Sequence, residues 1–156
     1  MKVLCRIFAA VLLVFATGAG VAAAQDVVSQ ARNAQTRAEG LAILEKHLSE
    51  SPRDVDVRLV YGLMLSWEGR YDDARRELRR VLEQTPTYTD ARVGLMNVEW
   101  WSNHLPAARE QVDFILSRDA GNTQARLMRQ RLDASSRPWT LTTSMAYDRF
   151  SDGRDA

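Results

Sequence analysis

The sequence lacks the residues on which several common classes of protein depend. It contains one cysteine, Cys5, so neither an internal disulfide nor a cysteine-based metal site is expected. The two histidines, His47 and His104, stand in neither an H-x-x-x-H nor an H-E pattern, and they give no basis for predicting a metal site. Basic and acidic residues number 21 and 20, and this balance gives no reason to expect general binding to nucleic acid or to anionic lipid.

Residues that could act together in catalysis are also missing. An enzyme needs a nucleophile, a base and an orienting group at one place, and no such set is visible in the sequence. We therefore predict no catalytic residues, no cofactor, no metal and no enzymatic activity.

Residues 1–24 differ in composition from the rest of the chain. They contain no acid, two bases, an apolar run over 7–16, and the small residues Ala22, Ala23 and Ala24. This order of basic, apolar and small segments is typical of a secretory signal peptide and predicts export, with cleavage after Ala24. An uncleaved membrane anchor is the alternative, although the apolar run is shorter than the roughly 20 residues that a membrane-spanning helix needs.

A period of 34 residues organises the middle of the chain. At this offset several identical residues coincide, among them Trp67 with Trp101 and Ala74 with Ala108. The first unit is degenerate and retains little of its first helix. The predicted repeat region covers residues 25–134, with units over about 21–54, 55–88 and 89–122 and a capping helix over 123–134.

The residues at this period resemble the tetratricopeptide repeat. The second unit matches that motif best, through Tyr61, Gly62, Gly69, Tyr71, Ala74, Leu78, Val81, Leu82 and Pro86. The resemblance implies an all-α solenoid of helical hairpins. In such a hairpin, small residues at the positions of Gly62 and Ala74 let the two helices approach closely. The third unit departs from the motif by placing Met96 at the first of these positions.

Local signals predict where the helices begin. The expected starts are at Asp54, Asp72, Thr89 or Asp90, Leu105 and Asn122. We expect side-chain oxygens of Asp54, Asp72 and Asn122 to cap their helices. The last helix is expected to run through Leu127, Met128 and Leu132 and to cover the exposed end of the stack.

The densest basic cluster consists of Arg75, Arg76, Arg79 and Arg80. It could hold an acidic partner or an anionic glycan. The alternative, which we favour, is a solvated outer helix face with ion pairs from Asp72 to Arg76 and from Arg79 to Glu83.

The pattern changes after Ala134. Residues 135–138 have the composition of a linker, and residues 139–150 alternate large apolar with small or polar side chains. Such alternation is typical of a transmembrane β-barrel strand, which predicts the start of a barrel domain over 139–156. A soluble edge strand or a disordered tail is the alternative. Because one strand cannot close a barrel, we expect the barrel to be incomplete and the chain to be a fragment.

The order of these segments resembles one family more specifically. A signal-like start, the run LSWEGRYDDAR over 65–75 and the run YDRFSDG over 147–153 are similar to the beginning of the YaiO family of outer-membrane β-barrel proteins. Trp67 and its repeat Trp101 are also typical of the helical arms of exopolysaccharide-export porins. The resemblance implies a periplasmic helical arm attached to an outer-membrane barrel.

The candidate binding residues follow from the tetratricopeptide resemblance, in which the first helix of each unit lines a concave groove. The matching positions are Leu59, Leu63, Trp67, Asn97, Trp100 and Trp101. Aromatic side chains on such a surface can stack on sugar rings or anchor a peptide, although tryptophans at helical spacing can instead belong to the core.

Three functions remain open at this point. The first is a non-enzymatic arm whose groove binds a protein, a peptide or a glycan strand. The second is a component of polysaccharide export through the outer membrane. The third is a free periplasmic adaptor built from the same repeats. No nucleic acid partner is expected in any of the three.

Overall fold

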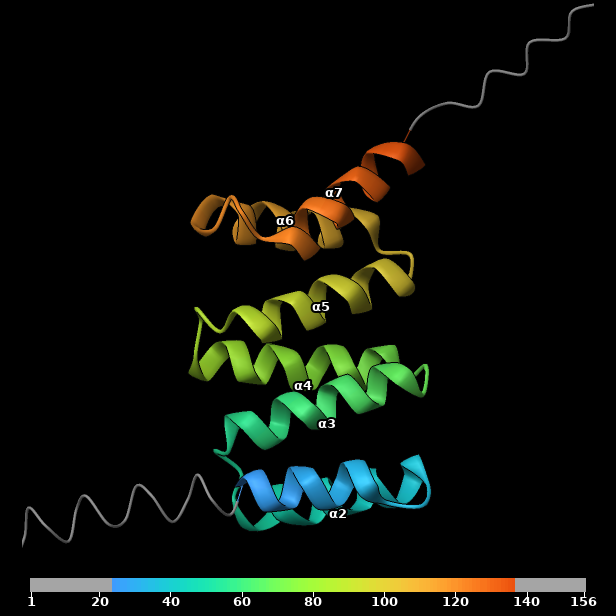
Figure 1. Ribbon diagram of the computed structural model, residues 1–156, viewed down its shortest axis with the longest axis vertical. Helices are drawn as coiled ribbons and strands as arrows, with labels where there is room; N and C mark the ends of the chain where they lie inside the picture. Colours follow the sequence, from blue (N-terminus) through green and yellow to red (C-terminus); the bar gives the residue numbers. More distant parts are fainter. Residues whose placement is uncertain (1–23, 137–156) are drawn as a thin grey trace, which may run out of the picture.

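The computed structural model describes residues 24–136, which form seven helices stacked in chain order along the long axis of the molecule (Figure 1). The first helix covers residues 24–33. It is followed by α2 (Arg37–Glu50), α3 (Val55–Trp67), α4 (Tyr71–Gln84), α5 (Thr89–Trp101), α6 (Leu105–Arg118) and α7 (Thr123–Ser135). Apart from Ala24, the predicted signal segment lies outside the described residues, and so does the predicted barrel strand.

The helix boundaries repeat with the period that the sequence predicts. α3, α5 and α7 begin at Val55, Thr89 and Thr123, and α2, α4 and α6 begin one period apart in the same way. We call residues 24–33 with α2 unit 1, α3 with α4 unit 2, and α5 with α6 unit 3. The prediction that unit 1 retains little of its first helix was wrong, because residues 24–33 are helical and bury Ala31.

Two of the three predicted helix caps are present. The side chain of Asp54 accepts a hydrogen bond from the backbone N–H of Val57, and that of Asn122 accepts one from Ala125. The third, by Asp72, was wrong. α4 begins one residue earlier, at Tyr71, and Asp72 lies inside its first turn.

The turns between the two helices of units 2 and 3 share a left-handed residue. Gly69 has φ of 73° and Asn103, one period later, has φ of 60°. Glycine adopts this conformation without steric cost, and asparagine tolerates it better than most residues. The turn between the two helices of a unit therefore requires a left-handed residue, and the sequence provides it with Gly69 and Asn103.

The core lies between successive helices. Ala74, Leu78 and Val81 of α4 are fully buried, and a Cβ placed on Gly62 of α3 would lie 3.1 Å from Leu78 Cγ. This distance confirms that the small residue lets the helices of unit 2 approach closely. Burying a side chain such as Leu78 contributes about 2 kcal/mol, so stacked stripes of this kind hold the repeat together.

The terminal helix α7 packs on α6 and presents a polar outer face. Met128 and Leu132 are buried, whereas 49% of the surface of Leu127 is exposed. The outer positions of α7 hold Arg126, Arg129, Gln130 and Asp133, all exposed. Among the described residues, this polar face covers the last apolar cluster of the stack.

None of the helices among residues 24–136 combines the length and the apolar content that crossing a bilayer requires.

Candidate functional site

Large apolar side chains are exposed at three places in the described part of the chain. Trp67, Trp101 and Leu127 have exposed fractions of 57%, 46% and 49%. All three belong to first helices of the repeat, α3, α5 and α7, and the two tryptophans are the last residues of their helices. An apolar surface left in water on successive helices is available for a partner to bury.

The six predicted groove residues do not share one environment. Trp67 and Trp101 are exposed, whereas Asn97 and Trp100 are half-buried. Trp100 packs against the apolar cluster of unit 3 and α7. Trp67 and Trp101 are only partly covered by the stack, and their role in binding stays a prediction.

The two predicted leucines take part in packing. Leu59 is buried in the apolar cluster formed by units 1 and 2 with α5. Leu63 is half-buried and packs toward α5, since a Cβ placed on Gly94 would lie 2.9 Å from Leu63 Cδ2. Leu127, in contrast, was missed as a candidate because the predicted groove residues were taken only from the second and third units. The period would have identified it, because it stands one repeat after Val93 and two after Leu59.

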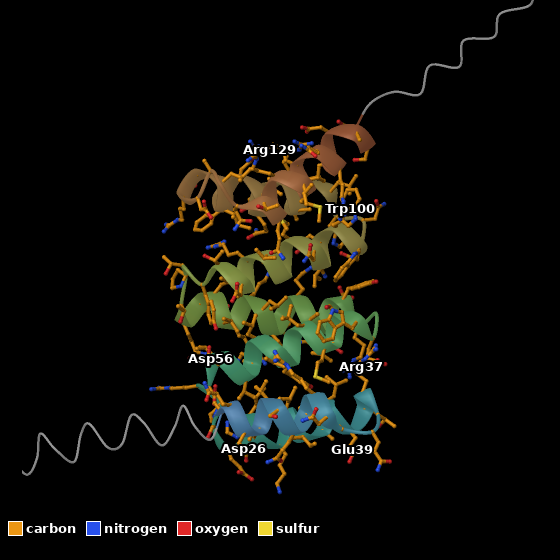
Figure 2. All side chains as sticks on the ribbon, viewed as in Figure 1. Asp26, Arg37, Glu39, Asp56, Trp100 and Arg129 are labelled. Atoms are coloured by element: carbon orange, nitrogen blue, oxygen red, sulfur yellow. The ribbon has the colours of Figure 1, made fainter. Side chains whose placement is uncertain are left out.

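The ends of the first helices gather on one edge of the stack. Figure 2 shows Arg37 and Trp100 on this edge and Asp56, near the start of α3, on the opposite edge. Arg37 begins α2 and reaches the end of α3. Its Nη1 donates to the carbonyl oxygen of Trp67 at 3.0 Å and to Glu68 Oε1 at 2.8 Å.

A cavity of about 270 Å³ lies beside Trp67 on this edge. We call it the Trp67 cavity. It is lined by Ala31, Arg32, Ala34, Thr36, Arg37, Met64 and Trp67. The cavity therefore lies at the junction of units 1 and 2, between the turn of unit 1 and the end of α3.

The junction of units 2 and 3 contains a buried ionic network centred on Glu99 of α5. Only 2% of the Glu99 side chain is exposed, and Arg75 Nε donates to its two oxygens at 2.9 and 3.0 Å. Arg79 lies 3.5 Å from Glu99, and His104 Nδ1 lies 3.2 Å from it. The hydrogen bond to Glu99 raises the pKa of Arg75 above its ordinary value, and a second one to Asp72 adds to this effect. Both keep Arg75 charged inside the junction.

The prediction that the four arginines form a solvated face was wrong for Arg75, whose side chain is 12% exposed. Its Nη1 binds Asp72 at 2.5 Å and its Nη2 donates to Ser102 Oγ at 2.8 Å. The sequence predicts ion pairs within one helix, from Asp72 to Arg76 and from Arg79 to Glu83. The structure instead pairs Asp72 with Arg75, Asp73 with Arg76, and Arg79 with Glu99. The first two pairs stay within α4 at i,i+3 spacing, and only Arg79 leaves its helix, because stacking brings Glu99 of α5 within its reach.

Several polar contacts recur at the period of the repeat. Arg58 donates to Glu77 and to the carbonyl oxygen of Pro52, and Arg92 donates in the same way to Gln111 and Pro86. The pair Arg75–Glu99 recurs as Arg109–Asp133, with 2.9 Å between Arg109 Nη1 and Asp133 Oδ1. The identities Arg58/Arg92 and Arg75/Arg109 in the aligned units were the signal for these contacts.

The two histidines take part in contacts between elements. His47 Nε2 lies 2.9 Å from Asp54 Oδ2, and His104 lies beside Glu99 and Arg75. Within residues 24–136, no three His, Cys, Asp or Glu side chains gather in a way that could hold a metal ion.

The repeat is also recognised by comparison with known proteins. Residues 65–132 match the family model of the tetratricopeptide repeat. The crystal structure of a thermophilic TPR protein of Thermus thermophilus matches with a TM-score of 0.56 and 21% sequence identity. The match covers 71% of this chain and 60% of that one, so the chain spans less than two thirds of its length. No curated protein matches the chain. The described residues thus have the fold of a tetratricopeptide repeat protein, a fold that typically serves as a non-enzymatic scaffold for protein–protein interaction.

Proposed function

We propose that this tetratricopeptide repeat protein is a non-enzymatic interaction module, and that it binds an extended segment of a partner protein along the exposed ends and faces of α3, α5 and α7. The observation that carries the proposal is the exposure of Trp67, Trp101 and Leu127 on three successive first helices. A single exposed apolar residue is ordinary, but Trp67 and Trp101 hold the same position in two successive units, and Leu127 adds exposed apolar surface on the next first helix.

The energetic role of each of these residues follows from its environment. Tryptophan is enriched among the residues that dominate binding energy, because it buries a large apolar area with few rotatable bonds. The two tryptophans end their helices, and their side chains are not needed to complete the described core. A partner that covers them gains stabilisation without disturbing the stack.

The experiment uses the full chain and a displayed library of random peptides. The affinity of a selected peptide is measured by fluorescence anisotropy for the wild type and for Trp67→Ala, Trp101→Ala and Leu127→Ala. We expect each tryptophan substitution to weaken binding by about 1–2 kcal/mol, roughly five- to thirtyfold, with helical content and melting unchanged. Gln84→Ala, an exposed change on α4, is the matched control and should bind like the wild type.

Two results would contradict the proposal. Equal affinity in all four variants would show that the surface of the first helices is not the binding face. A large loss of stability in Trp101→Ala would show that this ring belongs to the core.

We also propose an exported, periplasmic location and attachment to a barrel like that of the YaiO family. This proposal is supported only by the sequence of residues 1–24 and by the alternation over 139–150. Cell fractionation tests it: recovery in the outer membrane with a heat-modifiable band supports the barrel, and recovery in the soluble periplasm favours the free adaptor. If the barrel is present, loss of sugar export on gene deletion would favour polysaccharide transport. Retention in the cytoplasm would overturn both placements.

A further inference from the structure

The residues beside Trp67, at the junction of units 1 and 2, include two alanines where larger residues stand one period later. The lining residues Ala31, Arg32, Ala34, Thr36 and Arg37 correspond to Leu65, Ser66, Glu68, Arg70 and Tyr71. Two alanines are thus replaced by a leucine and a glutamate. Ala31 and Ala34 therefore leave room beside Trp67 where unit 2 has the larger side chains of Leu65 and Glu68.

The lining of the Trp67 cavity combines an apolar interior with cations. Ala31, Ala34 and Met64 contribute apolar surface, and Trp67 contributes an exposed aromatic ring. Two of the described lining residues, Arg32 and Arg37, are basic and none is acidic. The volume of about 270 Å³ exceeds the roughly 150 Å³ of an engineered cavity that binds benzene, so an aliphatic or aromatic side chain can enter.

We infer that the Trp67 cavity is a pocket for an apolar side chain of a partner peptide that carries a carboxylate next to it, so that the partner segment is acidic. The apolar group lies against Met64 and the indole of Trp67, and the carboxylate pairs with the guanidinium groups of Arg32 and Arg37. This inference rests on the proposed function and specifies the chemistry of its ligand.

The apolar interior favours a peptide over an acidic sugar. A sugar ring carries hydroxyl groups around its edge, and burying a hydroxyl without a hydrogen bond costs about 1–3 kcal/mol. The two alanines and the methionine offer no side-chain partner for such groups. A hydrocarbon side chain loses no hydrogen bonds on entering the cavity. The neighbouring carboxylate of the peptide stays at the charged rim, where arginine binds carboxylates in a forked geometry.

Arg37 is held in place by groups of α3. Its Nη1 contacts the carbonyl oxygen of Trp67 and the carboxylate of Glu68, and the side chains of Arg37 and Glu68 are 50% and 39% exposed. Glu68 therefore competes with a ligand carboxylate for the same guanidinium. Replacing Glu68 by glutamine keeps the shape of the side chain and removes the competing charge.

The test measures binding of small probes to the full chain by NMR. N-acetylphenylalanine carries a ring and a carboxylate, N-acetylphenylalaninamide carries the ring alone, and galacturonate is an acidic sugar. The indole N–H signal of Trp67, identified by its absence in Trp67→Phe, reports occupation of the cavity. We expect N-acetylphenylalanine to bind at least fivefold more tightly than the amide and than galacturonate.

Variants locate the two parts of the pocket. Ala34→Leu fills the cavity and is expected to weaken binding at least tenfold. Arg32→Gln should bring the affinity for N-acetylphenylalanine closer to that for the amide. Glu68→Gln should tighten binding of N-acetylphenylalanine about twofold to fivefold. Trp101→Ala, at the equivalent position of unit 3, is the matched control and should leave probe binding unchanged.

Each outcome decides one part of the inference. Unchanged affinity in Ala34→Leu, with the fold intact by circular dichroism, would overturn the cavity as the site. Equal binding of acid and amide would overturn carboxylate recognition, and tighter binding of galacturonate would overturn the peptide in favour of a glycan. The proposed function is tested separately, because it also depends on Trp101 and Leu127 and is measured by the affinity of the selected peptide.

Discussion

The two junctions between the repeat units use one backbone arrangement in different ways. Between units 1 and 2 lies a cavity whose rim holds the exposed pair of Arg37 and Glu68. Between units 2 and 3 lies a closed junction in which Glu99 and Arg75 are buried together. The comparison shows that the 34-residue period sets the positions of the helices. The side chains at a few repeated positions decide whether a junction is open or closed.

One pair of repeated positions makes the contrast explicit. The places of Arg75 and Glu99 are held by Leu41 and Leu65 one period earlier and by Arg109 and Asp133 one period later. The leucines are buried in one apolar cluster, the first ion pair is buried, and the second is exposed. The same geometry therefore accepts apolar, buried ionic and exposed ionic contacts.

The largest effect is expected from breaking the buried pair. Glu99→Leu leaves the guanidinium of Arg75 without its main partner in a place where water has little access. Removing one member of a buried ion pair typically costs about 3–5 kcal/mol, and the remaining bonds of Arg75 to Asp72 and Ser102 favour the lower end of this range. Urea unfolding followed by circular dichroism measures the change.

The double variant Arg75→Leu with Glu99→Leu copies the first junction into the second. Replacing a buried ion pair by apolar residues is often neutral or stabilising, so we expect the double variant to regain most of the lost stability. A double variant as unstable as Glu99→Leu would show that the leucines at the first junction depend on neighbours that the second junction lacks.

A second prediction concerns the closeness of packing in unit 1. Gly40 occupies the position of Ala74 and Ala108, but a Cβ on Gly40 would lie 2.5 Å from the carbonyl oxygen of Ala31. Alanine gains about 1 kcal/mol over glycine in helix propensity, but the backbone around Ala31 must move to make room for the new Cβ, and this costs more than the gain. We therefore expect Gly40→Ala to destabilise the protein by about 1–2 kcal/mol. Chemical denaturation measures it.

Gly94→Ala is the matched control. Its Cβ would meet Leu63 Cδ2 at 2.9 Å, which is the end of a flexible side chain that can move. We expect a change within about 0.5 kcal/mol of zero. Equal losses in the two variants would show that the neighbouring backbone oxygen is not what restricts Gly40.

The sequence predicts the helices well because their determinants are local and periodic. Asp54 and Asn122 cap the helices that they precede, and Gly69 provides the left-handed turn. The exposed ends at Trp67 and Trp101 lie where the tetratricopeptide resemblance places groove residues. Their role in binding stays a prediction.

The contents of the junctions were not predicted, because they depend on residues far apart in the chain. Arg75 and Glu99 come from different units, and sequence spacing favours pairs within one helix. The Trp67 cavity depends on the small volume of Ala31 and Ala34 beside α3, which no helical pattern reports. Leu127 was not proposed as a binding residue, because the last helix was predicted only to cover the end of the stack.

A third prediction uses pH to test a hydrogen bond on the opposite edge of the stack, where Figure 2 shows Asp56. Tyr88 stands one period after Asp54, and its hydroxyl donates to Asp56 Oδ1 at 2.6 Å. This hydrogen bond, with a further contribution from burial, raises the pKa of Tyr88 to about 12. In the unfolded chain tyrosine has a pKa of about 10, so the folded state holds the proton more tightly.

The stabilisation from this contact is complete below pH 10 and is lost as the pH rises to about 12. Tyr88→Phe removes the hydrogen bond at every pH, and we expect a loss of about 1 kcal/mol at neutral pH. The difference in unfolding free energy between wild type and variant should shrink above pH 10. A difference that stays constant across this range would contradict the hydrogen bond to Asp56.

The smallest effect is expected at the exposed copy of the ion pair. Asp133→Asn removes the charge that pairs with Arg109, but the Arg109 and Asp133 side chains are 40% and 51% exposed, and water solvates what is left. Exposed pairs contribute about 0.2–1 kcal/mol, so we expect a loss of about 0.5 kcal/mol or less, and none in high salt, where screening removes the attraction. Urea unfolding at low and high salt measures both values. A loss as large as that of Glu99→Leu would mean that position in the repeat, and not burial, sets the strength of this contact.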